Sequence, residues 1–597
     1  MNEYKSILLI KVPHCTHPEA DFERKQNFKS KSPFRPEPSL AIAVLHSFFE
    51  QYNSNGYELK ALDINIEAYS EPDVPIDVSL YPQIVTDCIR DNTYDVLAIS
   101  AMFIYNARWV DMVVKLSRQY HPDAKIILGG GYPTIFPERT LEDHEIDDAV
   151  IGEGEATFLH ILNKYNNYKD QVFEEMFPFE GYATRNENGA IEVVARSPKT
   201  FLTGDQLPAA NWDYFDVKKY LKNSGINYLP CEGSRGCPYV CTYCSTFITW
   251  GRKMRLKPPG RLVEEMKEIG RKYGAGVSFV DDNMSVIKSW FKEFLTTVIK
   301  ENLTQNLYAD NFSVKDLDEA RLDLMKEAGF KGFGIAVETG SKDMQKLIKK
   351  RLKFDQIQEV MDMSKARGFD VHVCWMVGFP TETLDQIKET FAFAKKLGGG
   401  SNQFMTTLPY PGTELFGLAK AEDVLLFDEH NLDKFENRQC DYVKSEEWDY
   451  RTLQEMIYDI NIDLNFLNLS EYKTEEGREG LLKRFEELVL RLEDHVIAHT
   501  VIGYLYNQKG EFNKSSLHYN NALKLMEKED CAETFEKYFF WDHPIINDFK
   551  QFTGYTPSVY PETQASLYAR TGPKPSLMAS DFRLIVNSAR SEMSLQA

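Results

Sequence analysis

The chain has 597 residues, of which 43% are hydrophobic and 27% charged, a composition typical of globular proteins and not of collagen or disordered chains. Asp and Glu number 90 against 69 Lys and Arg, which gives a formal net charge of -21. Because binding to nucleic acid or anionic lipid needs a cationic surface, this balance argues against both as partners. The first apolar run, residues 7–10, is too short for a signal peptide or a membrane span, which predicts a cytoplasmic protein.

Residues 1–165 alternate short apolar runs with amphipathic segments, the pattern of βαβ units in a doubly wound parallel sheet. The expected strands are 7–12, 59–64, 96–100 and 125–128, and the expected helices are 39–52, 81–90 and 107–120. Ligands bind such sheets in the crevice beyond the carboxyl ends of the strands. The loops expected at this crevice are 13–15, 63–65, 100–102 and the triglycine 129–131.

A less regular connector is expected over residues 166–228, and a second alternating series follows it. Its expected strands are 277–280, 334–337, 371–377 and 403–408, and its expected helices are 261–273, 318–328, 355–367 and 383–397. This series predicts a parallel β/α barrel or partial barrel over residues 229–440, with its chemistry at the carboxyl ends of the strands.

Helical periodicity dominates after about residue 445, which predicts a helical extension over residues 441–570 and a flexible tail over 571–597. The extension contains the spacing of a single tetratricopeptide unit, formed by Gly503, Tyr506, Gly510, Ser515, Tyr519 and Ala522. Since such repeats need neighbours to cover their faces, one unit favours a helical hairpin docked on the barrel over a peptide-binding array.

Three cysteines, Cys237, Cys241 and Cys244, form a C-x3-C-x2-C loop directly after an extended segment. Thiolates are the ligands of iron-sulfur clusters, and three ligands leave one iron of a four-iron cluster open to a small molecule. A zinc site would instead need a fourth Cys or a His nearby, and the next His is His372. The remaining cysteines are scattered, as is usual for small buried side chains: Cys15, Cys88, Cys231, Cys374, Cys440 and Cys531.

With the aromatic Tyr243 before its third cysteine, this loop resembles the signature of the radical S-adenosylmethionine (SAM) enzymes. The resemblance implies that the open iron binds the amino and carboxylate groups of SAM, whose reductive cleavage releases a 5'-deoxyadenosyl radical. Segments 278–283, 334–340 and 378–383 match further family motifs in the expected order. The SAM-binding residues that they imply are Asp281, Asp282, Asn283, Glu338, Thr339 and Gly340.

Two of these assignments have simpler alternatives. The turn at residues 281–283 could cap the following helix, a role that short polar side chains often fill. Glu338 could be a buried structural carboxylate.

The amino-terminal sheet resembles the cobalamin-binding domain of the cobalamin-dependent radical SAM enzymes. The resemblance implies cobalamin contacts from Ser100, Gly129, Gly130, Gly131 and Glu153. Small residues there would let the backbone approach a bulky ligand. The usual D-x-H-x-x-G motif is missing after the first strand, so the histidines at positions 14 and 17 are more simply loop residues than cobalt ligands.

The two resemblances together imply a C-methyltransferase that acts on an unactivated carbon of a small-molecule or peptide natural product. In this family one SAM provides the methyl group through cobalamin, and another provides the radical that abstracts substrate hydrogen. A low-potential flavodoxin or ferredoxin is the implied electron donor. Tyr308, Trp375 and Tyr410 are candidates for lining the substrate cavity, whereas the sequence identifies no catalytic side chain.

Alternative functions remain open. One is a cyclase or rearrangement enzyme of the same two-domain class that transfers no methyl group. Another is a non-catalytic cobalamin-binding interaction protein. A methylthiotransferase is disfavoured, because its amino-terminal domain would supply three more cluster cysteines and this one offers only Cys15 and Cys88.

Overall fold

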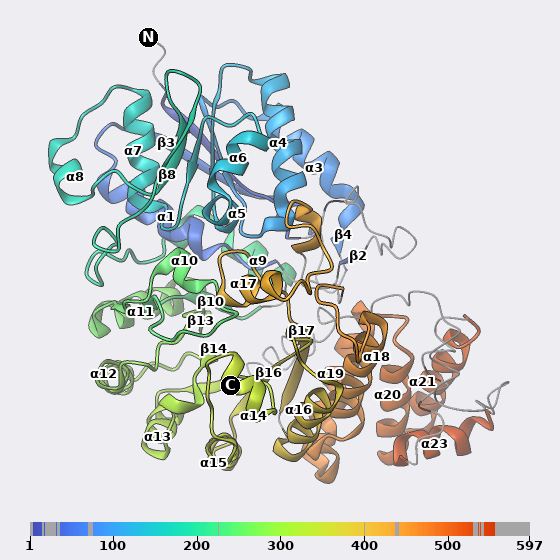
Figure 1. Cartoon of the computed structure of the whole chain (residues 1–597). Helices are drawn as coiled ribbons and strands as arrows, with labels where there is room; N and C mark the ends of the chain where they lie inside the picture. The colour runs from blue at the N-terminus through green and yellow to red at the C-terminus, as the bar shows by residue number, and fades with distance from the viewer. Residues whose placement is uncertain are drawn as a thin grey trace.

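The computed structural model is built around two large β-sheets with their helices, and a carboxyl-terminal helical unit lies beside the second sheet (Figure 1). It describes residues 4–14, 17, 31–32, 36–69, 76–224, 226–398, 400–435, 441–528, 535, 538 and 543–555. The predictions for Cys15, Cys440, Cys531 and the tail 571–597 lie outside these residues.

The amino-terminal sheet has seven strands; the first five in spatial order pair in parallel, and β8 and β9 are added by antiparallel pairing. Alternate residues of the central strand enter different hydrophobic clusters, so the sheet is buried on both faces, as in doubly wound folds. In spatial order the strands are β3 (Glu58–Asp63), β1 (Ser6–Lys11), β5 (Val96–Ser100), β6 (Lys125–Gly129), β7 (Asp148–Val150), β8 (Tyr182–Arg185) and β9 (Ile191–Val194).

Helices cover both faces of this sheet. The helices α1 (Leu40–Tyr52) and α7 (Glu155–Tyr165) pack on one face, and α3 (Tyr81–Asp91) and α4 (Ala107–Tyr120) pack on the other. The strands and helices predicted for this part of the chain are therefore confirmed, with ends that differ by one or two residues.

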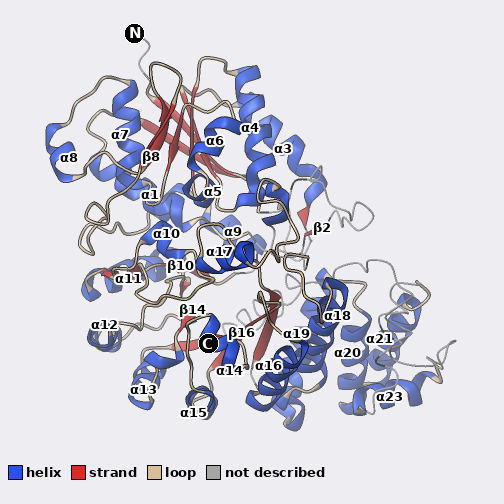
Figure 2. Cartoon of the chain, in the orientation of Figure 1, coloured by secondary structure: helices blue, strands red, loops and turns tan. Residues whose placement is uncertain are grey.

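The second sheet has six parallel strands in an open order, so it is the partial form of the predicted barrel (Figure 2). The strands are β10 (Tyr228–Cys231), β13 (Gly276–Phe279), β14 (Leu307–Phe312), β15 (Phe330–Glu338), β16 (Asp370–Val377) and β17 (Ser401–Thr406). The longer helices between them are α11 (Pro259–Tyr273), α12 (Lys288–Lys300), α13 (Glu319–Glu327), α15 (Phe354–Ala366) and α16 (Leu384–Leu397). The sequence pattern did not predict β14.

The two sheets share a hydrophobic core. One cluster contains Leu8 and Leu97 of the first sheet together with Val377 of the second sheet and Ile387 of its helix α16. This shared core fixes the two sheets relative to each other.

The carboxyl-terminal helices begin with α18 (Tyr450–Ile462), which continues into a π-helical turn, Asp463–Leu467, at the edge of β17. Asn465 in this turn accepts a hydrogen bond from the backbone N–H of Asn402 (2.9 Å) and donates one to its carbonyl (2.8 Å). The amide side chain thus satisfies backbone groups of an edge strand, which would otherwise be open to pairing with another chain.

The predicted hairpin is formed by α20 (Val496–Gln508) and α21 (Phe512–Leu525), which pack against α19 (Glu475–Arg491) and α23 (Pro544–Thr553). A Cβ atom at Gly503 would lie 2.4 Å from ring carbons of Tyr519, so this glycine allows the close approach of the two helices. In the part of the chain that the structure describes, no helix combines the length and apolarity that a bilayer crossing needs.

Candidate active site

The three-cysteine loop leaves the first strand of the partial barrel and is held by backbone contacts on two sides. Thr242 donates to the carbonyls of Leu347 and Ile348 (both 3.2 Å), and its own carbonyl accepts from the N–H of Leu415 (2.8 Å). Gly236 opens the loop at φ +85°, where a Cβ would lie 2.5 Å from the carbonyl oxygen of Lys253. The loop conformation is therefore set by its neighbours on both flanks.

The three thiols are partly buried and form no disulfide. Burial raises the pKa of Cys237 to about 11 and also raises that of Cys241, so a cation is needed to favour the thiolates. Within the described residues no three His, Cys, Asp or Glu side chains converge on a single metal ion. A four-iron cluster offers each thiolate a separate iron, so three free cysteines in one fixed loop fit such a cluster.

Glu338 ends β15 next to the cysteine loop in a strained backbone conformation. Its φ is +71°, which is costly for a residue with a side chain and is typical of functional sites. The carboxylate accepts a hydrogen bond from the Tyr243 hydroxyl (2.8 Å) and pairs with the Lys350 ammonium (3.0 Å). Glu338 and Tyr243, which the sequence predicted as site residues, therefore meet, and no sequence pattern had indicated Lys350.

The two residues after Glu338 fasten the strand end to α16. The Thr390 hydroxyl lies 3.0 Å from the Thr339 hydroxyl and accepts the Gly340 N–H at 3.0 Å. A Cβ at Gly340 would lie 2.8 Å from atoms of Thr390 and Phe393. Both residues help to place Glu338, and their contact with SAM stays a prediction.

The turn after β13 supports the cysteine loop. Asp281 accepts from the N–H of Gly233 (3.0 Å) and from the Ser234 hydroxyl (2.5 Å), and burial raises its pKa to about 7. Asp282 accepts from Thr246 (3.1 Å), and burial raises its pKa to about 6.

Asn283 belongs to a second contact with the loop. Its side chain donates to Asp316 (3.0 Å), which also accepts from the Tyr239 hydroxyl (3.0 Å). The N-cap of α12 is Ile287, so the alternative that this turn caps the next helix is wrong.

The crevice of the amino-terminal sheet is built from two touching loops after β5 and β6. A Cβ at Gly130 would lie 2.3 Å from the carbonyl oxygen of Ala101, and a Cβ at Gly131 would lie 2.3 Å from that of Met102. These two glycines therefore allow the loops to touch. The Met102 side chain is 58% exposed, and the rings of Phe103 and Tyr105 stack at 5.0 Å. An exposed thioether beside stacked rings fits the apolar face of a macrocycle such as a corrin.

The loop histidines differ in accessibility. His14 is exposed, with its ring 5.8 Å from that of Phe103, whereas His17 is buried with its ring 4.4 Å from that of Trp109.

Glu153 lies in a buried ion cluster between the two sheets. Its carboxylate contacts Arg255 and Arg235, which precedes the cysteine loop, and Arg235 also pairs with Glu155 (2.7 Å) and Glu232 (2.7 Å). Burial alone would raise the pKa of Glu155, but Arg235 more than offsets this and the pKa is lowered. The side chain of Glu153 thus links the first sheet to the second.

The two candidate cofactor regions face each other. The helix α10 (Thr246–Trp250), which follows the cysteine loop, packs against α5 (Gly131–Ile135), which begins at the triglycine. Near the same edge, Tyr410 after β17 makes a hydrogen bond with the backbone of Ile104.

Two of the three aromatic candidates for the substrate cavity are deeply buried. Trp375 is fully buried against Phe404 and bonds to Asn402 (3.0 Å) on the helix-covered face, so its prediction is wrong. Tyr308 is buried beside Tyr228 in a small cluster of its own. Tyr410 alone of the three lies at the edge shared by the sheets.

The sequence motif at residues 378–383 indicated a turn, but it did not indicate that the Glu382 carboxylate is buried. The carboxylate accepts from the N–H groups of Gly378 (2.6 Å) and Phe379 (3.1 Å), and its second oxygen has no hydrogen-bond partner among the residues that the structure describes. Burial raises its pKa to about 8.

Comparison with family models identifies two domains of the chain. Residues 35–162 match the model described as B12 binding domain, and residues 231–394 match the Radical SAM superfamily. The chain therefore carries a B12 binding domain followed by a radical SAM domain, the two-domain arrangement of the cobalamin-dependent radical SAM enzymes. The cofactors of this family are a four-iron cluster, SAM and cobalamin, as the sequence predicted.

Two relatives are similar in sequence to this chain over more than half of its length. The cytidylyl-2-hydroxyethylphosphonate methyltransferase of Streptomyces wedmorensis is 25% identical over 69% of this chain and 81% of its own length. The anaerobic magnesium-protoporphyrin IX monomethyl ester cyclase of Rubrivivax gelatinosus is 24% identical over 55% of this chain and 59% of its own length.

Solved structures support the fold. The cobalamin-dependent SAM radical enzyme OxsB, with aqua-cobalamin and SAM bound, matches with a TM-score of 0.60 at 14% identity, over 92% of this chain and 84% of that one. The radical SAM methyltransferase TsrM of Kitasatospora setae matches with a TM-score of 0.52 at 15% identity, over 70% and 78%.

Proposed function

We propose that this enzyme methylates an unactivated carbon of a small-molecule or peptide natural product, with a low-potential flavodoxin or ferredoxin as electron donor. The observation that carries the proposal is the packing of α10 on α5, since it brings the cysteine loop to the crevice of the first sheet. Methyl transfer at carbon in this family needs a radical source and a methyl carrier at one substrate, and the packing of α10 on α5 supports such an arrangement.

In this proposal Cys237, Cys241 and Cys244 hold the four-iron cluster. Glu338, fixed by Tyr243 and Lys350, receives the ribose or amino end of SAM, and the turn at residues 281–283 closes the SAM site from the second strand. The loops at Ser100–Met102 and at Gly129–Gly131 receive cobalamin.

When bound, the cluster and SAM supply a hydrogen-abstracting radical, and cobalamin supplies a transferable methyl group. The protein's own contribution is positioning. The buried cluster around Arg235 fixes the distance between the two cofactor regions, and the shared core excludes water from their interface. We assign Glu153 to this positioning role, because arginines and the Leu202 N–H occupy its carboxylate.

A cyclase function is the second candidate, favoured by the similarity to the magnesium-protoporphyrin ester cyclases. The products derived from SAM separate the two functions. A methyltransferase forms both S-adenosylhomocysteine and 5'-deoxyadenosine, whereas a cyclase that transfers no methyl group forms 5'-deoxyadenosine without S-adenosylhomocysteine.

The test is anaerobic purification with cobalamin supplied, followed by iron and sulfide analysis and the corrinoid spectrum. We expect the wild type to hold a four-iron cluster and about one cobalamin, and the Cys237→Ala, Cys241→Ala, Cys244→Ala variant to lose only the cluster. The matched control is Cys88→Ala, a partly buried cysteine of the first sheet's helices, which should keep both cofactors. A wild type that holds the cluster but no cobalamin would refute methyl transfer through cobalt.

A further inference from the structure

A strongly basic segment lies beside the cysteine loop of this otherwise acidic chain. Five of the eight residues from position 346 to 353 are basic and none is acidic, whereas the whole chain carries a net charge of -21. The segment contains Lys346, Lys349, Lys350, Arg351 and Lys353. Lys349 and Arg351 have φ values of +56° and +52°, so the backbone there is held in a strained turn.

Direct contacts attach this segment to the cysteine loop. Thr242 in the loop donates its N–H to the carbonyl of Ile348 and its hydroxyl to that of Leu347. Since Lys346 and Lys349 adjoin these residues in the chain, their backbones lie next to the loop.

A second pair of basic residues also contacts the cysteine loop. Arg252 donates to the carbonyl of Tyr239 (2.6 Å), and the Lys253 carbonyl lies against Gly236. We call Arg252, Lys253, Lys346, Lys349 and Arg351 the basic rim; all five side chains belong to exposed residues.

The centre of the rim is apolar and the charges are only partly neutralised. Pro238 and Val240, at the tip of the loop, are exposed, Val240 by 51%. Lys346 pairs with Asp343 and Lys349 with Glu414, while Lys253 and Arg351 have no ion pair within the described residues. An apolar centre inside a charged rim is the usual anatomy of a transient protein interface.

We propose that the basic rim and the tip of the cysteine loop form the docking surface for a small acidic one-electron carrier protein. This proposal rests on the proposed function, because it takes the loop to hold the four-iron cluster. One electron passes from the carrier to the cluster, so that the carrier is oxidised and the cluster reduced by one electron each, and no atom is transferred.

The rim explains how an acidic partner approaches an acidic enzyme. At physiological ionic strength charges act over about 8 Å, so a docked carrier experiences the rim more than the distant acidic surface. Nucleic acid is a weaker match, because a polyanion extends beyond the rim over surface of the same sign.

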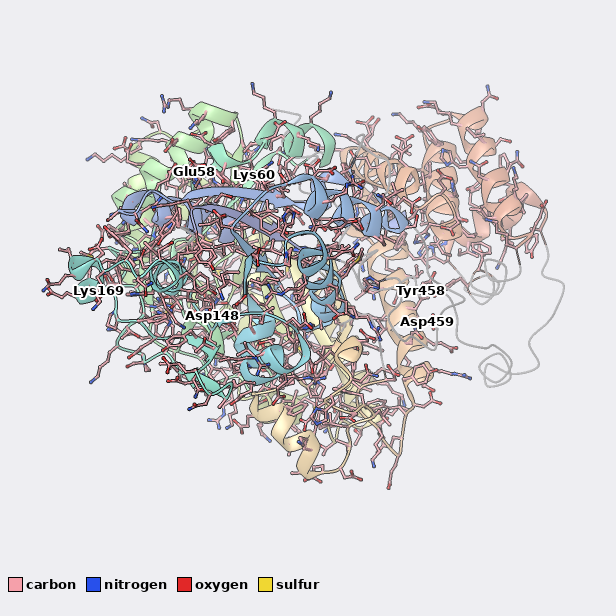
Figure 3. The ribbon with its side chains drawn as sticks, turned by 90° about the horizontal axis from the view of Figure 1, so that it is seen from above. Glu58, Lys60, Asp148, Lys169, Tyr458 and Asp459 are labelled. Atoms are coloured by element: carbon pink, nitrogen blue, oxygen red, sulfur yellow. The ribbon has the colours of Figure 1, made fainter. Side chains whose placement is uncertain are left out.

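The test compares charge reversal on the rim with the same charge change elsewhere. The rim variant is Lys253→Glu, Lys346→Glu, Arg351→Glu, and the control is Lys60→Glu, Lys169→Glu, Lys300→Glu, three exposed residues outside the rim. Figure 3 labels Lys60 and Lys169 on the amino-terminal half of the molecule. Loss of the cluster's visible absorbance is followed by stopped flow in the holoenzyme, with flavodoxin hydroquinone as the carrier or dithionite as the chemical reductant.

We expect the rim variant to slow reduction by flavodoxin at least tenfold at low salt, with the difference shrinking as salt is added. Reduction by dithionite should stay at the wild-type rate in both variants, and the control should keep the flavodoxin rate. Equal slowing in rim and control variants would show a bulk charge effect and overturn the proposal. An unchanged rate of reduction by flavodoxin in the rim variant would also overturn the proposal. The same holds if the rim substitutions lower only the affinity for a single-stranded oligonucleotide. If the wild-type protein holds no cluster that dithionite can reduce, this result would refute the proposed function and not the docking surface.

Discussion

At the scale of single residues, Glu382 should make stability depend on pH. Its pKa is raised from 4.5 to about 8, so the folded protein binds this proton more tightly than the unfolded chain does. The contribution of this group to the free energy of unfolding is therefore fully present below about pH 4.5 and is lost as pH rises through about 8. We expect this group to remove roughly 1.5 kcal/mol of the free energy of unfolding between about pH 6.5 and about pH 8.

The measurement is the denaturation midpoint as a function of pH for wild type and Glu382→Gln. The amide keeps an oxygen to accept from Gly378 and Phe379 but does not titrate, so the variant should lose this part of the pH dependence. Glu389→Gln, an exposed residue of α16, is the control and should keep the wild-type slope. A Glu382→Gln profile that runs parallel to the wild type would show that the carboxyl does not titrate in this range.

Residues of the site were predictable where a local motif identified them. The spacing of the cysteines and the aromatic residue before the third one indicated the loop, and a strand motif indicated Glu338, which the structure places beside Tyr243 of that loop. Lys350 and Arg235 were not found, because their importance depends on contacts with residues distant in the sequence, such as Tyr243 and Glu155. No local sequence pattern predicts which buried charged side chains contact each other.

At the scale of elements, the short strand β11 (Ser234–Arg235) should stabilise the link between the sheets. Arg235 neutralises three buried carboxylates, those of Glu153, Glu155 and Glu232. Removing one partner of a buried ionic cluster leaves the other charges uncompensated, which costs about 3–5 kcal/mol. We therefore expect Arg235→Met to lower the midpoint of unfolding strongly.

Calorimetry of Arg235→Met and of the exposed control Arg271→Met in α11 measures this effect. If uncompensated buried carboxylates cause the loss, adding Glu155→Gln to Arg235→Met should restore part of the stability. The second substitution removes one of the buried negative charges that Arg235 neutralised. Equal midpoints for Arg235→Met and Arg271→Met would mean that the cluster contributes no stability.

Elements were predictable where an apolar run or a helical period is continuous. The strands β1, β5 and β16 were found in this way. The strand β14 was missed because Asp310 and Asn311 interrupt its apolar run, and its neighbours β13 and β15 decide its place in the sheet. Sequence periodicity reports burial, and it fails where tertiary packing buries a polar segment.

At the scale of the whole molecule, hydrophobic clusters predict which parts unfold together. The two sheets share one cluster, which includes Leu97 and Val377. Among the described residues, the buried side chains of the core formed by α19, α20, α21 and α23 begin at Ile462, and this core is a separate cluster. We therefore expect two cooperative transitions on heating, one for both sheets together and one for the helical unit.

A substitution confined to the hairpin tests this division. Gly503→Ala places a Cβ within 2.4 Å of the Tyr519 ring, and relieving this overlap should cost about 1–3 kcal/mol. Hydrogen exchange should then speed up in α20 and α21 while amides of β5 and β16 keep their protection. The control is Gly480→Ala in α19, where a Cβ meets no atom within 4 Å. If Gly503→Ala loosens the sheets and the hairpin equally, the chain unfolds as one unit and the helical extension is part of the frame that positions the cofactors.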